Sequence, residues 1–316
     1  MSARTALVTG VAGQDGVYLA RRLLADGTRV VGTVLPGHDT SHTAYLQGVS
    51  VVEHDVRDTA GFRELVRAHR PTEVYNLAAV SSVGVSWDQP ELAVATNGAA
   101  VAGMLEVLVE QGGVRFFQAA SAEEHGSAQD SPYARSKTEA HALTTTARER
   151  DGLFACAAIL YNHESPLRAP HFVTRKITRA AAEISLGRRD TVSLGNLEVS
   201  RDWGHARDYV DAMVRMVRHD SPADFVVATG VAHTLAQLLD TAFAAAGIDD
   251  PTPYVVQDPA LVRPSDTAVM VGDPSRTREV LGWAARTTFE QTVAEMVAVD
   301  LRRVATGVEE DPAYLA

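Results

Sequence analysis

The chain has 316 residues, 46% of them hydrophobic, and a formal net charge of −11. Its length exceeds the usual limit for one hydrophobic core, so we expect two domains or one large domain with an added lobe. No dense block of Lys and Arg occurs, which argues against a protein that binds the phosphate backbone of nucleic acids.

The first half of the chain alternates short apolar strands with amphipathic helices. We expect strands at 5–9, 29–34, 50–53, 73–77, 114–118 and 154–160, and helices at 18–27, 60–68, 90–111 and 133–150. This alternation predicts an α/β protein with a Rossmann-type, doubly wound parallel sheet that is covered on both faces.

Beyond residue 162 the pattern is less regular, with helices expected at 174–186 and 235–246 and a strand at 224–229. We predict a dinucleotide-binding domain over 1–165, with returning segments near 208–232. A smaller C-terminal α/β lobe over 166–304 is expected to interleave with it and to bind the substrate. The polar end, 305–316, is expected to be a frayed tail.

The single cysteine, Cys156, lies in the apolar run FACAAIL, a setting typical of a buried structural thiol. No apolar stretch is expected to be long enough to span a bilayer, and the N-terminus reads straight into a strand without a signal peptide. The sequence therefore predicts a soluble, cytoplasmic protein with no membrane partner.

The first expected strand runs into TGVAGQDG, which contains Gly10, Gly13 and Gly16. Glycines at a strand-to-helix turn let the main chain approach a pyrophosphate, which the helix N-terminus then stabilises. This position predicts a dinucleotide site; the alternative is a tight turn without a ligand.

The adenosine end of that site is atypical. An acid for NAD or an arginine for NADP normally follows the second strand, but 33–36 reads Thr-Val-Leu-Pro. No Lys or Arg occurs between Arg29 and Arg57, and Asp39 comes a few residues late. Asp55, after the third strand, is a candidate to hold the adenine, or it caps the next helix.

The chain has two lysines against 27 arginines, and Lys137 stands four residues after Tyr133 in SPYARSK. On a helix this spacing puts both side chains on one face. The ammonium favours the phenolate and so lowers the pKa of the phenol from about 10. Tyr133 is therefore a candidate general base for a hydroxyl proton; the alternative is an ordinary surface pair.

Several longer segments resemble the extended short-chain dehydrogenase/reductase (NAD-dependent epimerase/dehydratase) superfamily, and most closely its GDP-mannose 4,6-dehydratase family. The likeness covers about 5 to 304 and is most specific in the last segments of this set: TGVAGQDG, NLAAVSSVGVSWDQP, FFQAASAEEHG, YNHESPLRAPHFVTRKITRA and SLGNLEVSRDWGHARDYV. The resemblance implies a lyase that oxidises C4 of a GDP-hexose, eliminates water across C5 and C6, and returns the hydride to C6.

By this resemblance Ser121 is the active-site hydroxyl, Glu123 an acid/base, Tyr133 the base and Lys137 its activator. The implied cofactor is NADP or NAD, held by Gly10, Gly13, Gln14, Asp15, Gly16, Asp55, Val56, Leu77, Ala78, Tyr133 and Lys137. The implied substrate contacts are Ser81, Asn162, Val173, Arg175, Lys176, Leu194, Gly195, Asn196, Arg201 and Arg263. Arginine forks suit a diphosphate, although Arg201 with Asp202 is also a candidate for an internal ion pair, and Asn162 for a cap.

Three features depart from the family pattern. Leu35 and Pro36 stand where arginines are expected, the stretch between Glu123 and Tyr133 is shorter, and Val80 and Ser82 replace polar Gln and His. A second hypothesis is therefore an isomerase of a GDP-hexose, either an epimerase or a pyranose/furanose mutase, without a standard NADP site.

A divalent metal is part of that second hypothesis, because Glu123, Glu124 and His125, with Asp130, offer ligands beside a diphosphate. A third hypothesis is a GDP-sugar binding module without catalysis. The family resemblance also implies a homodimer formed through two helices, one of which carries Tyr133.

Overall fold

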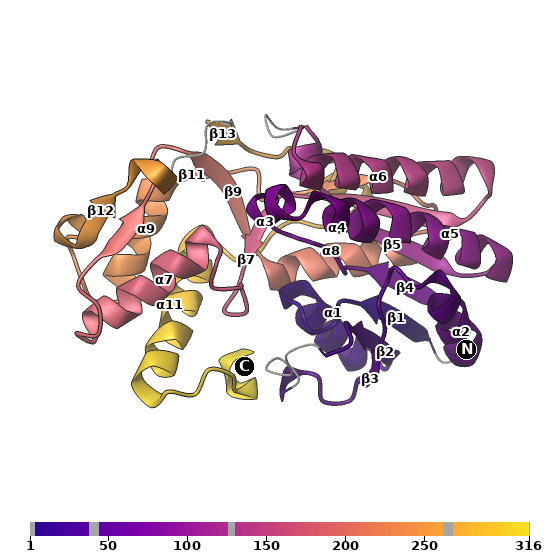
Figure 1. Cartoon of the computed structure of the whole chain (residues 1–316), viewed down its shortest axis with the longest axis horizontal. Helices are drawn as coiled ribbons and strands as arrows, with labels where there is room; N and C mark the ends of the chain where they lie inside the picture. The colour runs from indigo at the N-terminus through magenta and orange to yellow at the C-terminus, as the bar shows by residue number, and fades with distance from the viewer. Residues whose placement is uncertain (1–3, 38–43, 126–129, 262–267, 316) are drawn as a thin grey trace. The chain divides into compact units, whose positions relative to one another are not determined.

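The computed structural model describes residues 4–37, 44–125, 130–261 and 268–315, and these divide into two compact units (Figure 1). Unit 1 comprises Met1–Leu160, Val210–Val227 and Pro274–Trp283. Unit 2 comprises Tyr161–Tyr209, Ala228–Asp273 and Ala284–Ala316. The chain thus enters each unit more than once; that the second unit binds the substrate stays a prediction.

Unit 1 is built on a seven-stranded sheet in the order β10-β6-β5-β4-β1-β2-β3, in which all neighbours are parallel. This confirms the predicted α/β fold with a Rossmann-type sheet. The strands are β1 (Thr5–Thr9), β2 (Arg29–Val34), β3 (Ser50–Glu53), β4 (Glu73–Asn76), β5 (Arg115–Ser121), β6 (Phe154–Leu160) and β10 (Phe225–Val227). The strand order reverses between β1 and β4, where ligands of such sheets bind beyond the carboxyl ends of the strands.

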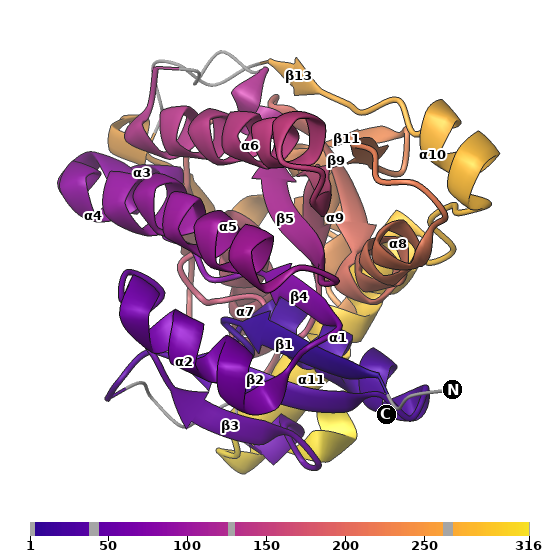
Figure 2. The same ribbon diagram turned by 90° about the vertical axis from the view of Figure 1, so that its right-hand side faces the viewer.

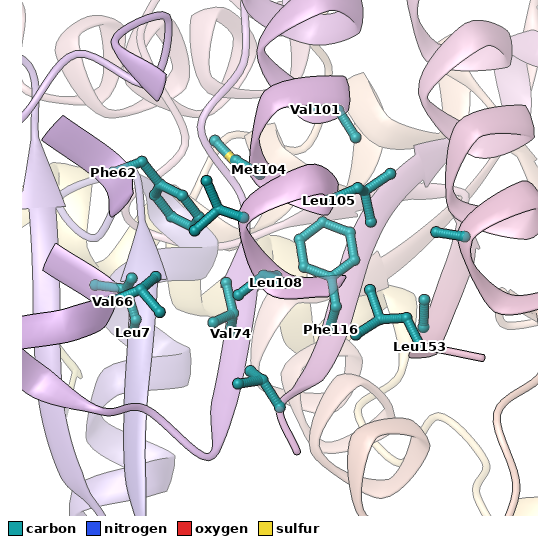
Figure 3. Packing of buried hydrophobic residues seen from close by; sticks show 14 of the residues in the cluster. Leu7, Phe62, Val66, Val74, Val101, Met104, Leu105, Leu108, Phe116 and Leu153 are labelled. Carbon is teal, nitrogen blue, oxygen red and sulfur yellow. The ribbon is translucent and has the colours of Figure 1, made fainter. Parts of the chain in front are cut away.

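Helices cover both faces of this sheet, with α2, α5 and α6 along one face (Figure 2). The helices of unit 1 are α1 (Gln14–Ala25), α2 (Thr59–His69), α3 (Val83–Asp88), α4 (Pro90–Val94), α5 (Ala100–Gln111), α6 (Pro132–Arg150) and α10 (Ser275–Leu281). Helix α8 (Ala206–Arg218) begins in unit 2 and continues into unit 1. The hydrophobic core between the sheet and the helices α2, α5 and α6 includes Leu7, Phe62, Met104, Leu108 and Phe116 (Figure 3).

The run Pro90–Gln111 corrects one expectation. By length and composition alone it is apolar enough to cross a membrane, whereas no stretch was expected to be. In the structure it is interrupted by a π-helical segment, Ala95–Ala99, and half of its apolar window is buried. Its apolar residues, including Val101 and Leu105, belong to the core of unit 1 (Figure 3).

Unit 2 is assembled from short strands and three helices that pack on one another, α7 (Val173–Ser185), α9 (Leu235–Ala245) and α11 (Phe289–Thr306). Its strands are β7 (Asn162–Glu164), β8 (Val192–Leu194), β9 (Ser200–His205), β11 (Ala232–Thr234), β12 (Val255–Gln257) and β13 (Val269–Met270). The tail differs from the frayed end that was expected. Pro312–Leu315 forms a 3-10 turn, and the buried Tyr314 donates its hydroxyl to the Val308 carbonyl at 2.7 Å.

A buried ionic cluster joins α7 to α11. Asp300 is fully buried, and its carboxylate pairs with Arg175 at 2.7 Å and accepts the Thr178 hydroxyl at 2.8 Å. Arg303, also buried, lies 3.4 Å from the same carboxylate. Asp300 is therefore the buried anion next to two buried guanidinium groups of unit 2, those of Arg175 and Arg303.

Replacing Asp300 tests this pairing. We expect Asp300→Asn to lower the free energy of unfolding by about 3–5 kcal/mol, since it leaves buried guanidinium groups without their anion. Urea denaturation measures this, with exposed Asp249→Asn as the matched control. Equal stability of the two variants would contradict the assignment.

Candidate active site

The glycine loop lies between β1 and α1 at the strand-order reversal. Gly10 has a φ of +68°, and a Cβ there would lie 3.0 Å from the Ala78 main chain. A Cβ on Gly16 would lie 2.4 Å from the Gly10 carbonyl oxygen. Gly13 is the N-cap of α1 and adds no side-chain cap. The loop therefore requires glycine sterically and leaves main chain beside a helix N-terminus, as a pyrophosphate site needs.

Thr9 connects this loop to the end of β4. Its buried hydroxyl donates to Asn76 at 2.7 Å and accepts the N–H groups of Leu77 and Ala78, both at 3.1 Å. On the loop side, the Gln14 amide donates to Asp15 at 3.2 Å. Leu77, Ala78, Gln14 and Asp15, all expected cofactor contacts, thus lie on segments at the same edge of the sheet, beyond β1 and β4.

The adenosine end is less typical, as the sequence indicated. Thr33 is buried, whereas Leu35 is 53% exposed and offers no charge to a 2′-phosphate. Asp55 is paired with Arg57 through its side chain and accepts the Arg57 N–H at 3.0 Å, and this pairing lowers the pKa of Asp55. Asp39 and Arg263 lie outside the described residues.

The cap of α2 comes from a different residue than the one considered from the sequence. Asp58, not Asp55, caps α2 by accepting the Gly61 N–H at 3.0 Å. Val56, between them, is buried. Asp55 is therefore not needed for the helix and remains a candidate for the adenine.

Tyr133 and Lys137 lie on the first turns of α6. Ser131 caps this helix by accepting the Ala134 N–H, and Pro132 occupies its first turn, where a missing N–H costs nothing. The Lys137 ammonium lies 5.9 Å from the Tyr133 ring centroid and donates to the Ala119 carbonyl at 2.9 Å. Lys137 is buried, so the alternative of an ordinary surface pair does not apply to it.

Burial and nearby anions act on Lys137 in opposite directions. Desolvation is the largest effect and lowers its pKa, the charges of Glu124 and Asp15 raise it, and the net pKa is about 8. The ammonium therefore stays mostly charged at neutral pH, which is the form that favours a neighbouring phenolate.

The end of β5 carries the expected hydroxyl and acid. Ser121 is buried and caps the short 3-10 turn Ala122–Glu124, because its hydroxyl accepts the Glu123 N–H at 3.2 Å. Glu123 is half-buried. Glu124 is buried and accepts the Ser121 N–H at 2.9 Å. Both expected groups thus belong to one hydrogen-bonded turn, and Lys137 contacts the strand that leads into it, at Ala119 of β5.

The metal hypothesis gains no support at this turn. Both carboxylate oxygens of Glu124 have other partners, one the Ser121 N–H and the other Nδ1 of His141. Among the described residues, no group of three or more His, Cys, Asp and Glu side chains has metal-binding geometry.

Residues after β4 that depart from the family pattern have structural partners. Asn97, in the π-helical segment, accepts the Val80 N–H at 2.8 Å and donates to the Val80 carbonyl at 3.1 Å and to the Ser136 hydroxyl at 3.2 Å. Ser82 caps α3. Ser81 between them is exposed. Asn97 was not predicted, because its only signal in the sequence is a polar residue inside an apolar helix.

In unit 2, several expected substrate residues are accessible. Asn162 and Lys176 are half-buried, Val173 and Asn196 are exposed, Gly195 is half-buried and Leu194 is buried. Asn196 accepts the Glu198 N–H at 2.9 Å.

The two expected arginines of unit 2 that the structure describes, Arg175 and Arg201, differ in their burial and in their partners. Arg175 differs from expectation, because its guanidinium is buried and used by Asp300 and by the carbonyls of Pro166 and Arg168. Arg201 is half-buried and donates to the Ser200 carbonyl.

The motif residues that flank these positions hold unit 2 together. Asp202, considered as a partner for Arg201, accepts the Thr229 and Gly230 N–H groups at 2.9 Å. Glu164, in the NHESP motif, accepts the Thr174 hydroxyl at 2.6 Å and pairs with Arg168 at 3.1 Å. Part of what makes these motifs recognisable is therefore residues that stabilise unit 2.

Taken with the fold, the glycine loop and the Tyr-x-x-x-Lys helix define a member of the extended short-chain dehydrogenase/reductase class. Within that class the chain belongs to the GDP-mannose 4,6-dehydratase family, whose model matches residues 7–296. It is 39% identical to GDP-mannose 4,6 dehydratase 2 of Arabidopsis thaliana, over 94% of this chain and 87% of that protein.

Two further comparisons agree. The chain is 37% identical to GDP-mannose 4,6-dehydratase of Sinorhizobium fredii, over 94% of this chain and 97% of that protein. Among solved structures, it resembles UDP-glucose 4-epimerase of Thermus thermophilus in complex with NAD, with a TM-score of 0.80, 25% identity, and coverage of 96% of this chain and 100% of that one.

His141 gives the site a pH-dependent stability. Hydrogen bonds that the His141 ring donates to the carboxylates of Asp224 and Glu124 raise its pKa from 6.5 to about 9. Folding therefore favours protonated His141, and the resulting stability is full below pH 6.5 and is lost as the pH rises through about 9. Lys137 has the opposite effect: because folding lowers its pKa to about 8, its contribution to the stability rises as the pH increases above 8. The effect of His141 is therefore best measured between pH 6.5 and 8.

We expect the stability advantage of the wild type over His141→Gln to shrink as the pH rises through that window. Urea denaturation of both proteins at several pH values measures it. Parallel stability curves would show that His141 is not held protonated by folding.

Proposed function

We propose that this protein is a GDP-mannose 4,6-dehydratase that works with a nicotinamide cofactor. Family membership supports the substrate class and the reaction. The observation that carries the mechanism is the buried Lys137 ammonium, held against Ala119 and 5.9 Å from the Tyr133 ring centroid. It supplies a fixed positive charge where a sugar hydroxyl must be deprotonated.

The proposed cofactor is NADP or NAD, and the residues present fit it. The glycine loop, Leu77 and Ala78 would hold the pyrophosphate and nicotinamide side, Asp55 and Val56 the adenine side, and Tyr133 and Lys137 the ribose. When bound, the nicotinamide supplies hydride acceptance from C4 and hydride return to C6.

The residues of this chain carry the proton transfers. Tyr133 takes the proton of the 4-hydroxyl as C4 becomes a ketone, and Lys137 stabilises the phenolate. The ketone acidifies the proton at C5, which Glu123 removes. Ser121 and Glu123 then assist the C6 hydroxyl to leave as water, with the proton that Glu123 took from C5, and the proton that Tyr133 took from the 4-hydroxyl returns to C5. The net change is the loss of one water, and the cofactor ends in its starting oxidation state.

We propose that the GDP moiety is held by the accessible residues of the expected set, namely Ser81, Asn162, Val173, Lys176, Gly195, Asn196 and Arg201, and by the main chain of the buried Leu194. Arg175 is left out because Asp300 already occupies its guanidinium. Lys176, next to it on α7, remains a candidate for the diphosphate.

The homodimer through α6 and a second helix also remains a proposal. It is supported by exposed apolar side chains on the neighbouring helices α3 to α5, among them Trp87, Val94 and Val109.

Turnover of GDP-mannose tests the function. We expect the purified protein to release NADP or NAD on denaturation and to convert GDP-mannose into a 4-keto product lighter by one water, both measured by mass spectrometry. An isomer of unchanged mass would instead support the isomerase hypothesis. Binding of GDP-mannose without any turnover would support the binding module.

Tyr133→Phe tests the base. We expect kcat to fall by at least about 10²-fold with little change in KM, because the proton transfer is lost while the ring remains. Tyr254→Phe, which changes a tyrosine of unit 2 outside the proposed site, is the control. Full activity of Tyr133→Phe would remove Tyr133 from the mechanism.

Chelation tests the metal hypothesis. We expect turnover of GDP-mannose to be the same before and after treatment with EDTA, because Glu124 is committed to Ser121 and His141. Loss of activity that added Mg²⁺ or Mn²⁺ restores would contradict this.

A further inference from the structure

One buried acid of unit 1 has no part in the mechanism above. Glu124 is 8% exposed, although it belongs to a sequence that reads as an acidic surface loop. One carboxylate oxygen accepts the Ser121 N–H at 2.9 Å, and the other lies 2.8 Å from Nδ1 of His141. A buried carboxylate is costly unless it is paired, so this geometry calls for a reason.

His141 extends the pairing toward the far edge of the sheet. It lies on α6, one turn beyond Lys137, and its Nε2 is 3.4 Å from Asp224, just before β10. Asp224 in turn accepts hydrogen bonds from both terminal nitrogens of the Arg148 guanidinium, each at 2.7 Å. Four charges therefore alternate in sign in the order Arg148, Asp224, His141 and Glu124, and Lys137 follows as the next cation.

This row of charges affects both the turn with Ser121 and Glu123 and the Lys137 ammonium. Through its bond to the Ser121 N–H, Glu124 closes the turn that carries Ser121 and Glu123. Its charge also acts on Lys137 and raises the pKa that burial has lowered. A pair of apolar residues would hold α6 against β5 about equally well. Packing alone therefore does not account for the charges.

We propose that Glu124, clamped by His141, is a positioning residue that fixes the Ser121–Glu123 turn and acts by its charge on Lys137. Its importance for catalysis rests on the proposed function. The charged and titratable groups around Lys137 come from three places: Asp15 on α1 and Glu124 after β5, whose charges act on it, and Tyr133 on α6, whose ring centroid is 5.9 Å from the ammonium. His141 contacts Glu124 and Asp224, and Arg148 contacts Asp224.

The lysine titration tests the electrostatic part without any assay of activity. Lys137 and Lys176 are the only lysines in the sequence, so lysine labelled with ¹³C at Cε gives two assignable NMR signals. We expect Glu124→Gln, which keeps the shape and removes the charge, to move the Lys137 titration to lower pH by roughly one unit. Lys176 serves as the internal control, and Glu149→Gln, an exposed acid on the same helix, should leave Lys137 unchanged.

Kinetics test the positioning part. We expect Glu124→Gln to lower kcat roughly 10- to 100-fold, as small misplacements of catalytic groups do, while KM for GDP-mannose changes less than about twofold. The double variant Glu124→Gln/His141→Gln should be no slower than the slower single variant, because both act through one contact. Additive losses would contradict the clamp.

Two results would overturn the inference: an unchanged Lys137 titration in folded Glu124→Gln, or a kcat within about twofold of the wild type. Circular dichroism and a urea melt establish that the variant is folded. If the wild type itself does not dehydrate GDP-mannose, the proposed function fails. The lysine titration still decides whether Glu124 controls Lys137.

Discussion

The site depends on one buried charge, the ammonium of Lys137. It donates to the Ala119 carbonyl on β5, two residues before Ser121, and so ties the helix of the proposed base to the strand of the proposed hydroxyl. Burial alone would neutralise an amine in this position. Glu124 and Asp15 counter that effect and hold the pKa at about 8, so that one electrostatic balance sets both geometry and chemistry.

Unit 1 was largely predictable because local patterns determine it. The apolar strands β1, β2, β3 and β6 have the predicted bounds, and the glycine spacing marked the loop after β1. Helix α8 was not predicted as a helix, although ARDYVDAMVRMVR is amphipathic; only a returning segment of the dinucleotide-binding domain near 208–232 was expected there. The pairing of Glu124 with His141 was also missed. The two residues are 17 apart in sequence, and burial, which sequence alone does not give, separates Glu124 from the accessible Glu123.

Unit 2 was less predictable because distant pairings determine it. Its strands have two to six residues, too few for a periodic pattern, and they pair across long intervals of sequence. Arg175 and Lys176 are neighbours in one motif, but Asp300, 125 residues beyond Arg175, takes the arginine and leaves the lysine. The motif resemblance treated both cations alike, because it does not show that Arg175 pairs with the buried Asp300 whereas Lys176 stays half-buried.

The most direct test of this account is the ionisation of Tyr133 itself, followed by NMR of tyrosine labelled with ¹³C at Cζ and assigned by its loss in a phenylalanine variant. We expect the phenol to have a pKa below that of an ordinary tyrosine, and Lys137→Met to raise it. An unperturbed phenol that does not respond to the removal of Lys137 would contradict the central claim.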